Sequence, residues 1–336
     1  DLLQRRGDVM SAAIARAFHS RSIRMAKRKI LIDCDPGIDD AVMLMLAFSA
    51  RDELDILGVT TVAGNLPLSL TTTNACIIRA LSKREDTPVY AGCPRPMVRD
   101  VIEASDFHGK NGLADLVFPA PKRLAETGHG VDFLEKSLLE ATEPVTLVVT
   151  GPFTNVALAI IKNPAILASV DQIVVMGGAR NEAGNYTPSA EFNIAADPHA
   201  AHVVFTCGKP IVAFGLDVTH RALATPERIA AIEAIGQPHA SAVAAMLKWV
   251  AKVEKDLKGY AGAPLHDPCT IAFLLAPELF SFKSCHVAVE INSPLTAGHT
   301  PPDYWNTTGK KPNTQWADRV DDDRLFALIT ERLKTL

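Results

Sequence analysis

The sequence predicts an α/β fold, in which an open and mostly parallel sheet carries helices on both faces. Short β-branched runs alternate with longer helical patterns from Lys29 onward, which is the order expected of parallel strands joined by helices. The strand runs are hydrophobic throughout, which is typical of strands buried on both faces. No repeat or Pro/Gly-rich linker interrupts this order. We therefore expect residues 29–336 to form one Rossmann-like domain.

Three strands are predicted first, with the sequences KILIDC, LDILGVTTVA and PVYAG. Helices are predicted after the first two, from about Gly37 and about Ser69, because apolar residues recur there with a helical period. A long loop follows the third strand. The N-terminal half of the sheet is thus predicted to consist of strand–helix units.

The next three predicted strands are PVTLVVT, DQIVVMGG and PIVAFG. The helical patterns FTNVALAIIKN and DPHAAHVVFTCG follow the first two, and further helices are predicted from about Thr225 to Lys255. In the C-terminal part, CHVAVEI and NTQWADRV are predicted to be edge strands, with a closing helix after them. The alternation therefore continues to the end of the chain.

Composition excludes several classes of protein. With 336 residues, 48% hydrophobic and 21% charged, the chain is expected to be soluble and globular. A net charge of −4 gives no basic excess for a nucleic-acid partner. No apolar run reaches the roughly 18–20 residues of a membrane span. Six scattered cysteines without a C-x-x-C pair disfavour a zinc site and a disulfide framework, which is consistent with a cytoplasmic protein.

The segment MSAAIARAFHSRSIRM, at residues 10–25, has a composition of its own. It is rich in Arg and Ser and lacks acids, as an organelle transit peptide does. The alternative interpretation, which we favour, is an extension derived from upstream sequence or from cloning. Residues 1–28 are therefore excluded from the predicted fold.

An acidic cluster follows the first predicted strand in ILIDCDPGIDDA, which contains Asp33, Asp35, Asp39 and Asp40. Asp35 could cap a helix that starts at Pro36, and the last two acids could then interact with the helix dipole. This interpretation does not explain four acids, because like charges at short range raise each other's pKa unless a cation or proton intervenes. A hard divalent cation such as Ca²⁺ suits carboxylate and carbonyl oxygens. Both interpretations remain open from this stretch alone.

Further polar residues follow the other predicted strands. They include Asn65, Thr150, Met176, Asn185, Glu191, Asn193 and Asp217. In parallel α/β sheets, ligands bind beyond the carboxyl ends of the strands, so these residues are candidates for one site. Far downstream, GAPLHDPCT contains His266 and Asp267 before Pro268, and taken alone this motif is best interpreted as a helix cap. Its position relative to Asp35 does not follow from spacing.

Seven motifs, in order, carry a family resemblance: DCDPGIDDA, TTVAGN, VTGPFTNVA, MGGARNEAGN, AEFNIAADPHAA, GLDVTH and LHDPC. Together they resemble the inosine-uridine-preferring nucleoside hydrolases, and in particular the bacterial pyrimidine-preferring ribonucleoside hydrolases. The resemblance covers the chain from about Lys29 to its end. It implies the nucleoside hydrolase fold and hydrolysis of ribonucleosides, with uridine and cytidine preferred and inosine as a further candidate, for nucleoside salvage. It also implies a homotetramer.

The resemblance implies a calcium ion as cofactor. Its ligands would be the carboxylates of Asp35, Asp40 and Asp267 and the backbone carbonyl of Thr150. Asp35 would also act as the general base on a calcium-bound water that attacks C1′ of the ribose.

The resemblance further assigns the sugar contacts. These would come from Asp39 and Asn65 near the ion, from Asn185, Glu191 and Asn193 on the 3′ and 5′ side, and from Met176 beneath the ring. Because buried polar groups would be left unpaired when a hydroxyl is missing, 2′-deoxynucleosides should be poor substrates.

Two histidines are assigned to the leaving base. His266 matches the general acid of the family, and histidine titrates in the range that this role requires. His108, in DFHGKNGL, resembles a loop histidine of pyrimidine-preferring members, although a solvent-exposed loop histidine is the alternative. Tyr260 differs from the residue expected in such relatives and is left out of the predicted site.

Two other functions remain open. ILIDCDPG also resembles the D-x-D start of haloacid-dehalogenase-type phosphatases, although the expected threonine is missing and extra acids follow. A non-enzymatic nucleoside- or ribose-binding module could use the same residues with calcium as a structural ion. Such a module would have no need for both a general base and a general acid.

Overall fold

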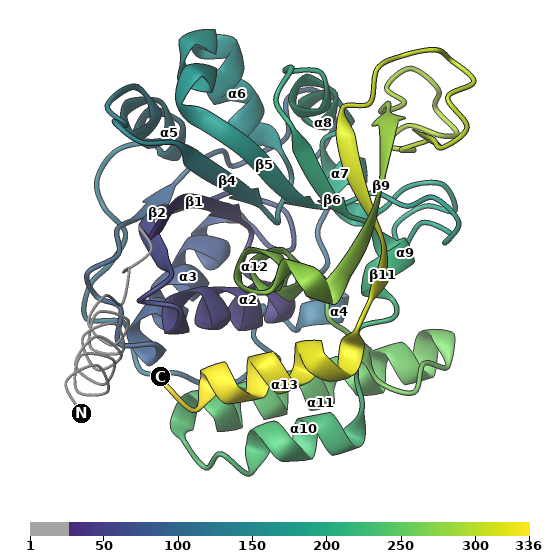
Figure 1. Ribbon diagram of the computed structural model, residues 1–336. Helices are drawn as coiled ribbons and strands as arrows, with labels where there is room; N and C mark the ends of the chain where they lie inside the picture. The colour runs from purple at the N-terminus through teal and green to yellow at the C-terminus, as the bar shows by residue number, and fades with distance from the viewer. Residues whose placement is uncertain (1–26) are drawn as a thin grey trace, which may run out of the picture.

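A nine-stranded sheet forms the centre of the structure, a computed structural model that describes residues 27–336 (Figure 1). Its strands are β1 (Arg28–Cys34), β2 (Leu54–Thr61), β3 (Val89–Ala91), β4 (Val145–Val149), β5 (Val170–Met176), β6 (Ile211–Phe214), β9 (Phe280–Val287), β10 (Pro302–Asp303) and β11 (Thr314–Val320). Their order is β10-β9-β11-β6-β5-β4-β1-β2-β3. The predicted transit-peptide or extension segment lies outside the described residues.

The sheet is mostly parallel, which confirms the predicted fold class. Strands β1 to β6 and β11 pair in parallel, while β9 runs antiparallel to β11 and to β10. The prediction that residues 313–320 form an edge strand is wrong, because β11 lies between β6 and β9. Its Trp316 side chain is fully buried in the core.

The connections change direction at the centre of this sheet. The chain passes from β1 to β2 and β3 on one side, and then returns to β4, β5 and β6 on the other side of β1. The chain therefore leaves the adjacent strands β1 and β4 toward opposite sides of the sheet. Such a switch point leaves a crevice at the carboxyl ends of the strands, where ligands of open α/β sheets bind.

Helices cover both faces of the sheet (Figure 1). One face carries α5 (Gly130–Leu139), α6 (Thr154–Lys162) and α8 (Pro198–Phe205). The other carries α2 (Ile38–Ser49), α3 (Leu68–Leu81), α12 (Pro268–Leu275) and α13 (Asp322–Leu333), with α10 (Pro226–Glu233) and α11 (Pro238–Lys258) packed outside them. Within residues 27–336, no helix is long and apolar enough to cross a membrane.

Short elements complete the chain. They are α4 (Ser105–His108), α7 (Phe192–Ala196), α9 (Leu216–Thr219), the 3₁₀ turns η1 (Pro164–Ser169) and η2 (Pro277–Leu279), and the ribbon of β7 (Leu223–Ala224) and β8 (Ala263–Pro264). All six cysteine side chains are free, as their spacing predicted.

Helix α2 is buried along almost its whole length. Its residues 41–48 are all apolar and buried, as is typical of a helix enclosed by a core. The helix begins at Ile38, and the Asp40 carboxylate accepts a hydrogen bond from the backbone N of Gly37 at 3.1 Å. The prediction that Asp35 caps this helix is therefore wrong. Asp35 has a different environment, which belongs to the site described below.

Asp197 joins three segments on the opposite face. This fully buried residue is the N-cap of α8. Its carboxylate accepts hydrogen bonds from the backbone N of Met97 at 2.8 Å, from Thr154 Oγ1 at 2.7 Å and from the backbone N of Ala200 at 3.1 Å. One side chain thus connects the loop after β3 to the starts of α6 and α8.

Asp197→Ala should lower the free energy of unfolding by about 3 kcal/mol or more, because it leaves buried donors without an acceptor. Asp321→Ala is the matched control, since Asp321 is an exposed N-cap of α13 that accepts from the backbone N of Arg324. Its loss should cost about 1 kcal/mol. Urea denaturation of both variants measures the difference, and equal losses would contradict the role given to Asp197.

Candidate active site

One pocket opens at the carboxyl ends of the central strands, at the switch point. Every candidate site residue that the sequence predicted lines this pocket except Asp35, Asp40 and Asp217. The lining ones are Asp39, Asn65, His108, Thr150, Met176, Asn185, Glu191, Asn193, His266 and Asp267. Asp35 and Asp40 are fully buried below it. The structure therefore brings residues from six separate segments of the chain to one place.

Asp40 is held by contacts to three neighbouring loops. Besides Gly37, its Oδ2 accepts from Asn65 Nδ2 at 3.2 Å, and its Oδ1 accepts from Thr150 Oγ1 at 3.0 Å. These contacts join the loops after β1, β2 and β4. Burial, followed by the charge of Asp39, raises the pKa of Asp40 to about 7. The protein thus places a carboxyl group where its ionised form is costly unless a cation is present.

The Asp35 carboxylate is enclosed on two sides by glycines. A Cβ on Gly64 would lie 2.1 Å from Asp35 Oδ2, and a Cβ on Gly151 would lie 2.8 Å from Oδ1. Oδ2 accepts from the backbone N of Asn65 at 2.6 Å. Oδ1 is buried and has no hydrogen-bond partner among residues 27–336. Gly64 and Gly151, in the AGN and TGP motifs, therefore leave room for the Asp35 carboxylate. Within residues 27–336, one oxygen of this carboxylate accepts no hydrogen bond.

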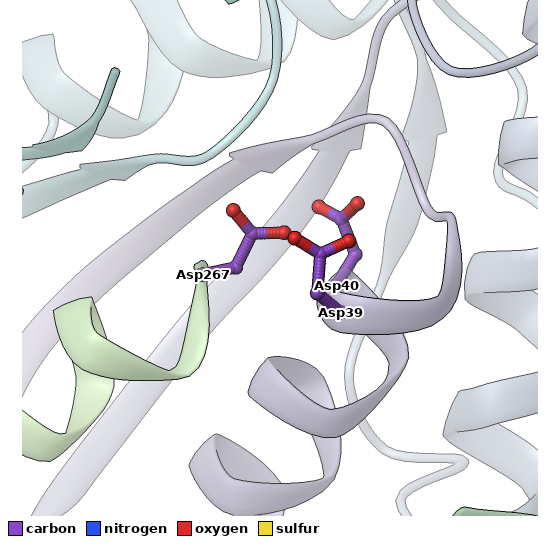
Figure 2. Close-up of side chains that lie close together, drawn as sticks. All are labelled: Asp39, Asp40 and Asp267. Carbon is purple, nitrogen blue, oxygen red and sulfur yellow. The ribbon is translucent and has the colours of Figure 1, made fainter. Parts of the chain in front are cut away.

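Asp39, Asp40 and Asp267 form a cluster whose ligand atoms all lie within 4.8 Å of one another. Figure 2 shows the Asp267 carboxylate, at the start of α12, pointing toward the two carboxylates at the start of α2. Asp267 occupies the N-cap position of α12, but its side chain makes no capping hydrogen bond. The interpretation of His266–Pro268 as a helix cap is therefore wrong, because the carboxylate faces the other acids.

Burial and mutual repulsion act together on these acids. Burial, and then the charge of Asp40, raises the pKa of Asp35 well above its ordinary value. Burial, and then the charges of Asp39 and Asp40, does the same for Asp267. With the unpartnered Oδ1 of Asp35, this set of hard oxygen donors fits a divalent cation. The residues present could thus hold a metal ion.

Asp33, the fourth acid of the opening motif, lies apart from this cluster. Its Oδ1 accepts hydrogen bonds from Thr60 Oγ1 and from Asn155 Nδ2. Burial raises its pKa to about 7. Asp33 therefore connects β1 to β2 and to α6, so one of the four acids in ILIDCDPGIDDA has a structural role and does not require a cation.

The predicted sugar-binding residues are ordered by hydrogen bonds to backbone groups. Glu191 caps α7 and accepts from the backbone N of Asn193 at 2.9 Å and from that of Gly178 at 3.1 Å. Asn193 Nδ2 donates to the carbonyl of Thr150 at 2.7 Å, which fixes the predicted metal-binding carbonyl. Asn185 Oδ1 accepts from the backbone N of Phe192 at 2.8 Å. Burial raises the pKa of Glu191 to about 7.

The two histidines have different environments. His266 Nδ1 lies 2.8 Å from Thr219 Oγ1. His108 lies at the end of α4 and is buried, so the exposed-loop alternative is wrong. Its Nδ1 accepts a hydrogen bond from the backbone N of Ile38 at 3.1 Å, and burial lowers its pKa. This hydrogen bond assigns the neutral tautomer, with the proton on Nε2.

Sequence reasoning found only His108 of the pocket wall that α4 and α11 form. It missed Phe107, which precedes His108 in DFHGKNGL, and Glu254, which belongs to no motif. Trp249 Nε1 donates to the carbonyl of Phe107 at 3.0 Å, which connects the two helices. The Tyr260 hydroxyl lies 3.1 Å from His220 Nδ1, and Tyr260 is not among the residues that line the pocket.

Asp217, which the sequence placed at the same edge of the sheet, has a structural role. Its carboxylate accepts hydrogen bonds from the backbone N of Arg180 at 2.8 Å and of Asn181 at 2.6 Å. It therefore shapes the loop after β5.

Comparison with known proteins agrees with this geometry. A model of the family described as inosine-uridine preferring nucleoside hydrolase matches residues 30–327. The chain is 45% identical over 306 residues to the pyrimidine-specific ribonucleoside hydrolase RihA of Escherichia coli O7:K1, which covers 91% of this chain and 98% of that protein. It is 44% identical over 310 residues to an uncharacterized protein of Schizosaccharomyces pombe, covering 92% and 99%.

A solved structure supports the same conclusion. The purine-preferring ribonucleoside hydrolase from Gardnerella vaginalis has a TM-score of 0.85 and 30% identity to this chain, covering 91% of this chain and 98% of its own. The phosphatase and binding-module alternatives are thereby set aside. Because the family match spans the sheet and every predicted site residue, the chain belongs to the inosine-uridine preferring nucleoside hydrolase family and is a ribonucleoside hydrolase.

Proposed function

We propose that this hydrolase uses calcium to cleave the N-glycosidic bond of uridine and cytidine, releasing free base and ribose for nucleoside salvage. The observation that carries the proposal is the cluster of Asp39, Asp40 and Asp267 beside Asp35, at the pocket that His266 and His108 line. The pyrimidine preference is supported by the identity to RihA. The fold alone does not decide it, since a purine-preferring enzyme shares this fold.

Asp35, Asp40, Asp267 and the Thr150 carbonyl would hold the calcium ion. All four donors are oxygens, which suits Ca²⁺ better than zinc. When bound, the cation offsets the charge of these carboxylates and favours deprotonation of a water molecule in the pocket. Asp35 accepts that proton, because its Oδ2 is fixed by the backbone N of Asn65 and its Oδ1 has no hydrogen-bond partner among residues 27–336.

The sugar contacts stabilise the charge that develops on the ribose. Asp39, Glu191 and the amides of Asn185 and Asn193 line the pocket around the space for the sugar, and Met176 packs beneath it. As the bond from C1′ to the base breaks, the ribose acquires oxocarbenium character, which nearby carboxylates stabilise. Hydroxyl recognition by these groups disfavours 2′-deoxynucleosides.

The leaving base receives the electron pair of the broken bond and needs a proton or a hydrogen-bond donor. His266 supplies the proton, with its Nδ1 oriented by Thr219. His108 contributes differently, because its Nδ1 is occupied by the backbone N of Ile38. It donates a hydrogen bond from Nε2 and remains neutral.

Two further proposals concern the oligomeric state of the enzyme and its cellular compartment. A homotetramer is the assembly that the family resemblance implies. A reducing cytoplasm is consistent with six free cysteines.

Purified protein with calcium should release base and reducing sugar from uridine and cytidine, with much slower release from 2′-deoxyuridine. Asp35→Asn should lower kcat by about 10³, since general-base catalysis is worth roughly 10²–10⁴. Asp52→Asn, an exposed acid in the turn before β2, should leave kcat unchanged. Full activity of Asp35→Asn would refute the assignment of the base, and no free base from any ribonucleoside would refute the proposed function.

Calcium should stabilise the protein more at pH 8 than at pH 5. The pKa of Asp40 is about 7 in the folded protein against an ordinary 3.8, so the folded state binds this proton more tightly than the unfolded chain does. The metal-free protein therefore loses stability as pH rises from about 4 to about 7. Calcium binds the ionised carboxylates, so the gain in Tm should reach roughly 5 °C at pH 8.

Thermal unfolding with calcium and with a chelator measures this gain. Asp267→Asn should remove most of it, while Asp256→Asn, an exposed acid on α11, should retain it. An equal calcium effect at both pH values would show that these carboxylates do not form the binding site.

A further inference from the structure

The loop after β3 is attached at two points to the end of the short helix α7. The backbone N of Met97 donates to the Asp197 carboxylate at 2.8 Å, and Nη1 of the half-buried Arg99 donates to the carbonyl of Ala195. Ala195 lies in the last turn of α7, and Asp197 directly follows this helix. The loop therefore holds the C-terminal end of α7 through one backbone group and through the side chain of Arg99.

The side chains proposed on the 3′ and 5′ side of the sugar all depend on α7. Glu191 is the N-cap of this helix, and Asn193 lies within it. Asn185 accepts a hydrogen bond at 2.8 Å from the backbone N of Phe192, the first residue of the helix. Asn193 Nδ2 donates in turn to the Thr150 carbonyl at 2.7 Å. A displacement of α7 would therefore move these sugar contacts together.

A helix as short as α7 needs support at both ends. It has five residues, whereas isolated helices shorter than roughly 12–15 residues are marginal in water. The last carbonyls of any helix also lack partners within that helix. At the N-terminal end, Glu191 accepts from backbone N–H groups. At the other end, the Arg99 guanidinium satisfies a carbonyl and interacts favourably with the negative end of the helix dipole.

We infer that Arg99 is a positioning residue for the ribose, which keeps the groups on the 3′ and 5′ side in place by holding the C-terminal end of α7. Arg99 is not among the described residues that line the pocket, so it acts through α7. The contacts proposed near the ion stand elsewhere, because Asp39 belongs to α2 and Asn65 follows β2. This inference rests on the proposed function and extends it to a residue outside the pocket.

Arg99→Met tests the inference, because methionine keeps an unbranched side chain and removes the hydrogen-bond donors. The ratio of kcat/KM for uridine to that for 5′-deoxyuridine should fall about tenfold, since misplaced groups lose discrimination for the hydroxyl that they bind. The ratio for uridine to 2′-deoxyuridine should stay unchanged. Both ratios are measured with saturating calcium on one preparation, so a smaller fraction of folded protein alters neither.

Arg95→Met is the matched control. Arg95 is an exposed arginine of the same loop, and its Nη1 donates to the carbonyl of the adjacent Pro96 at 3.3 Å. Its replacement should leave both ratios unchanged. Arg99→Lys keeps a cationic donor and should recover most of the ratio for uridine to 5′-deoxyuridine. If Arg99→Met does not fold, Arg99→Gln repeats the test with a shorter and uncharged side chain.

Unchanged ratios in the folded Arg99 variants would overturn the inference, because α7 would then not need the guanidinium. An equal fall of both ratios would overturn it as well, because the effect would not be confined to the 3′ and 5′ side of the sugar. Either outcome leaves the hydrolase intact. Failure of the unmodified, calcium-loaded enzyme on every ribonucleoside would instead overturn the proposed function, and the inference with it.

Discussion

The repulsion among buried carboxylates at the end of β1 is the constraint on which the rest of the site depends. Asp35, Asp40 and Asp267 are each nearly inaccessible to water. The charge of Asp40 raises the pKa of Asp35 and of Asp267, and the charge of Asp35 also raises that of Asp267. Without a positive charge, the folded protein can keep them together only by protonating some of them. The cost is met by surrounding donors from Asn65, Gly37 and Thr150. This part of the fold therefore has the oxygen donors and the negative charge that fit a cation.

The topology of the sheet explains why these groups meet. Adjacent strands β1 and β4 send their loops in opposite directions, so polar groups from both can occupy the space between them without a helix covering it. The late helix α12 then packs against α2 and brings Asp267 to the same place. A site assembled from residues this far apart in sequence forms only when the whole sheet has formed.

Much of the fold could be predicted from sequence because the strands and helices differ in period and hydrophobicity. The failures have physical causes. NTQWADRV has the alternation of a half-exposed strand, yet Trp316 is buried because β9 continues the sheet beyond it. Asp35 has the local context of a helix cap, but Gly37 takes the N-cap position and Asp40 accepts from its backbone N.

The candidate site could be named in advance only through motifs that resemble a family. Spacing does not bring Asp267 near Asp40, and it does not separate Asp33, which points to Asn155, from its acidic neighbours. Glu254 was missed because it belongs to no motif. A buried acid on a helix of mixed composition becomes visible only when the pocket wall is known. The residues proposed to hold the metal and the sugar therefore have a local sequence pattern, whereas the pocket wall on α11 has none.

The hydrogen bond from Trp249 to Phe107 has a consequence for how such enzymes can diverge. It joins α4 and α11 into one wall of the pocket, while Asp39, Asn65 and Thr150 line the pocket from the strand ends. Substitutions in this wall can change its shape and polarity without moving a carboxylate at the strand ends. This chain is similar both to a purine-preferring and to a pyrimidine-specific hydrolase, and a wall built apart from the strand ends is a part of the fold in which such relatives can differ.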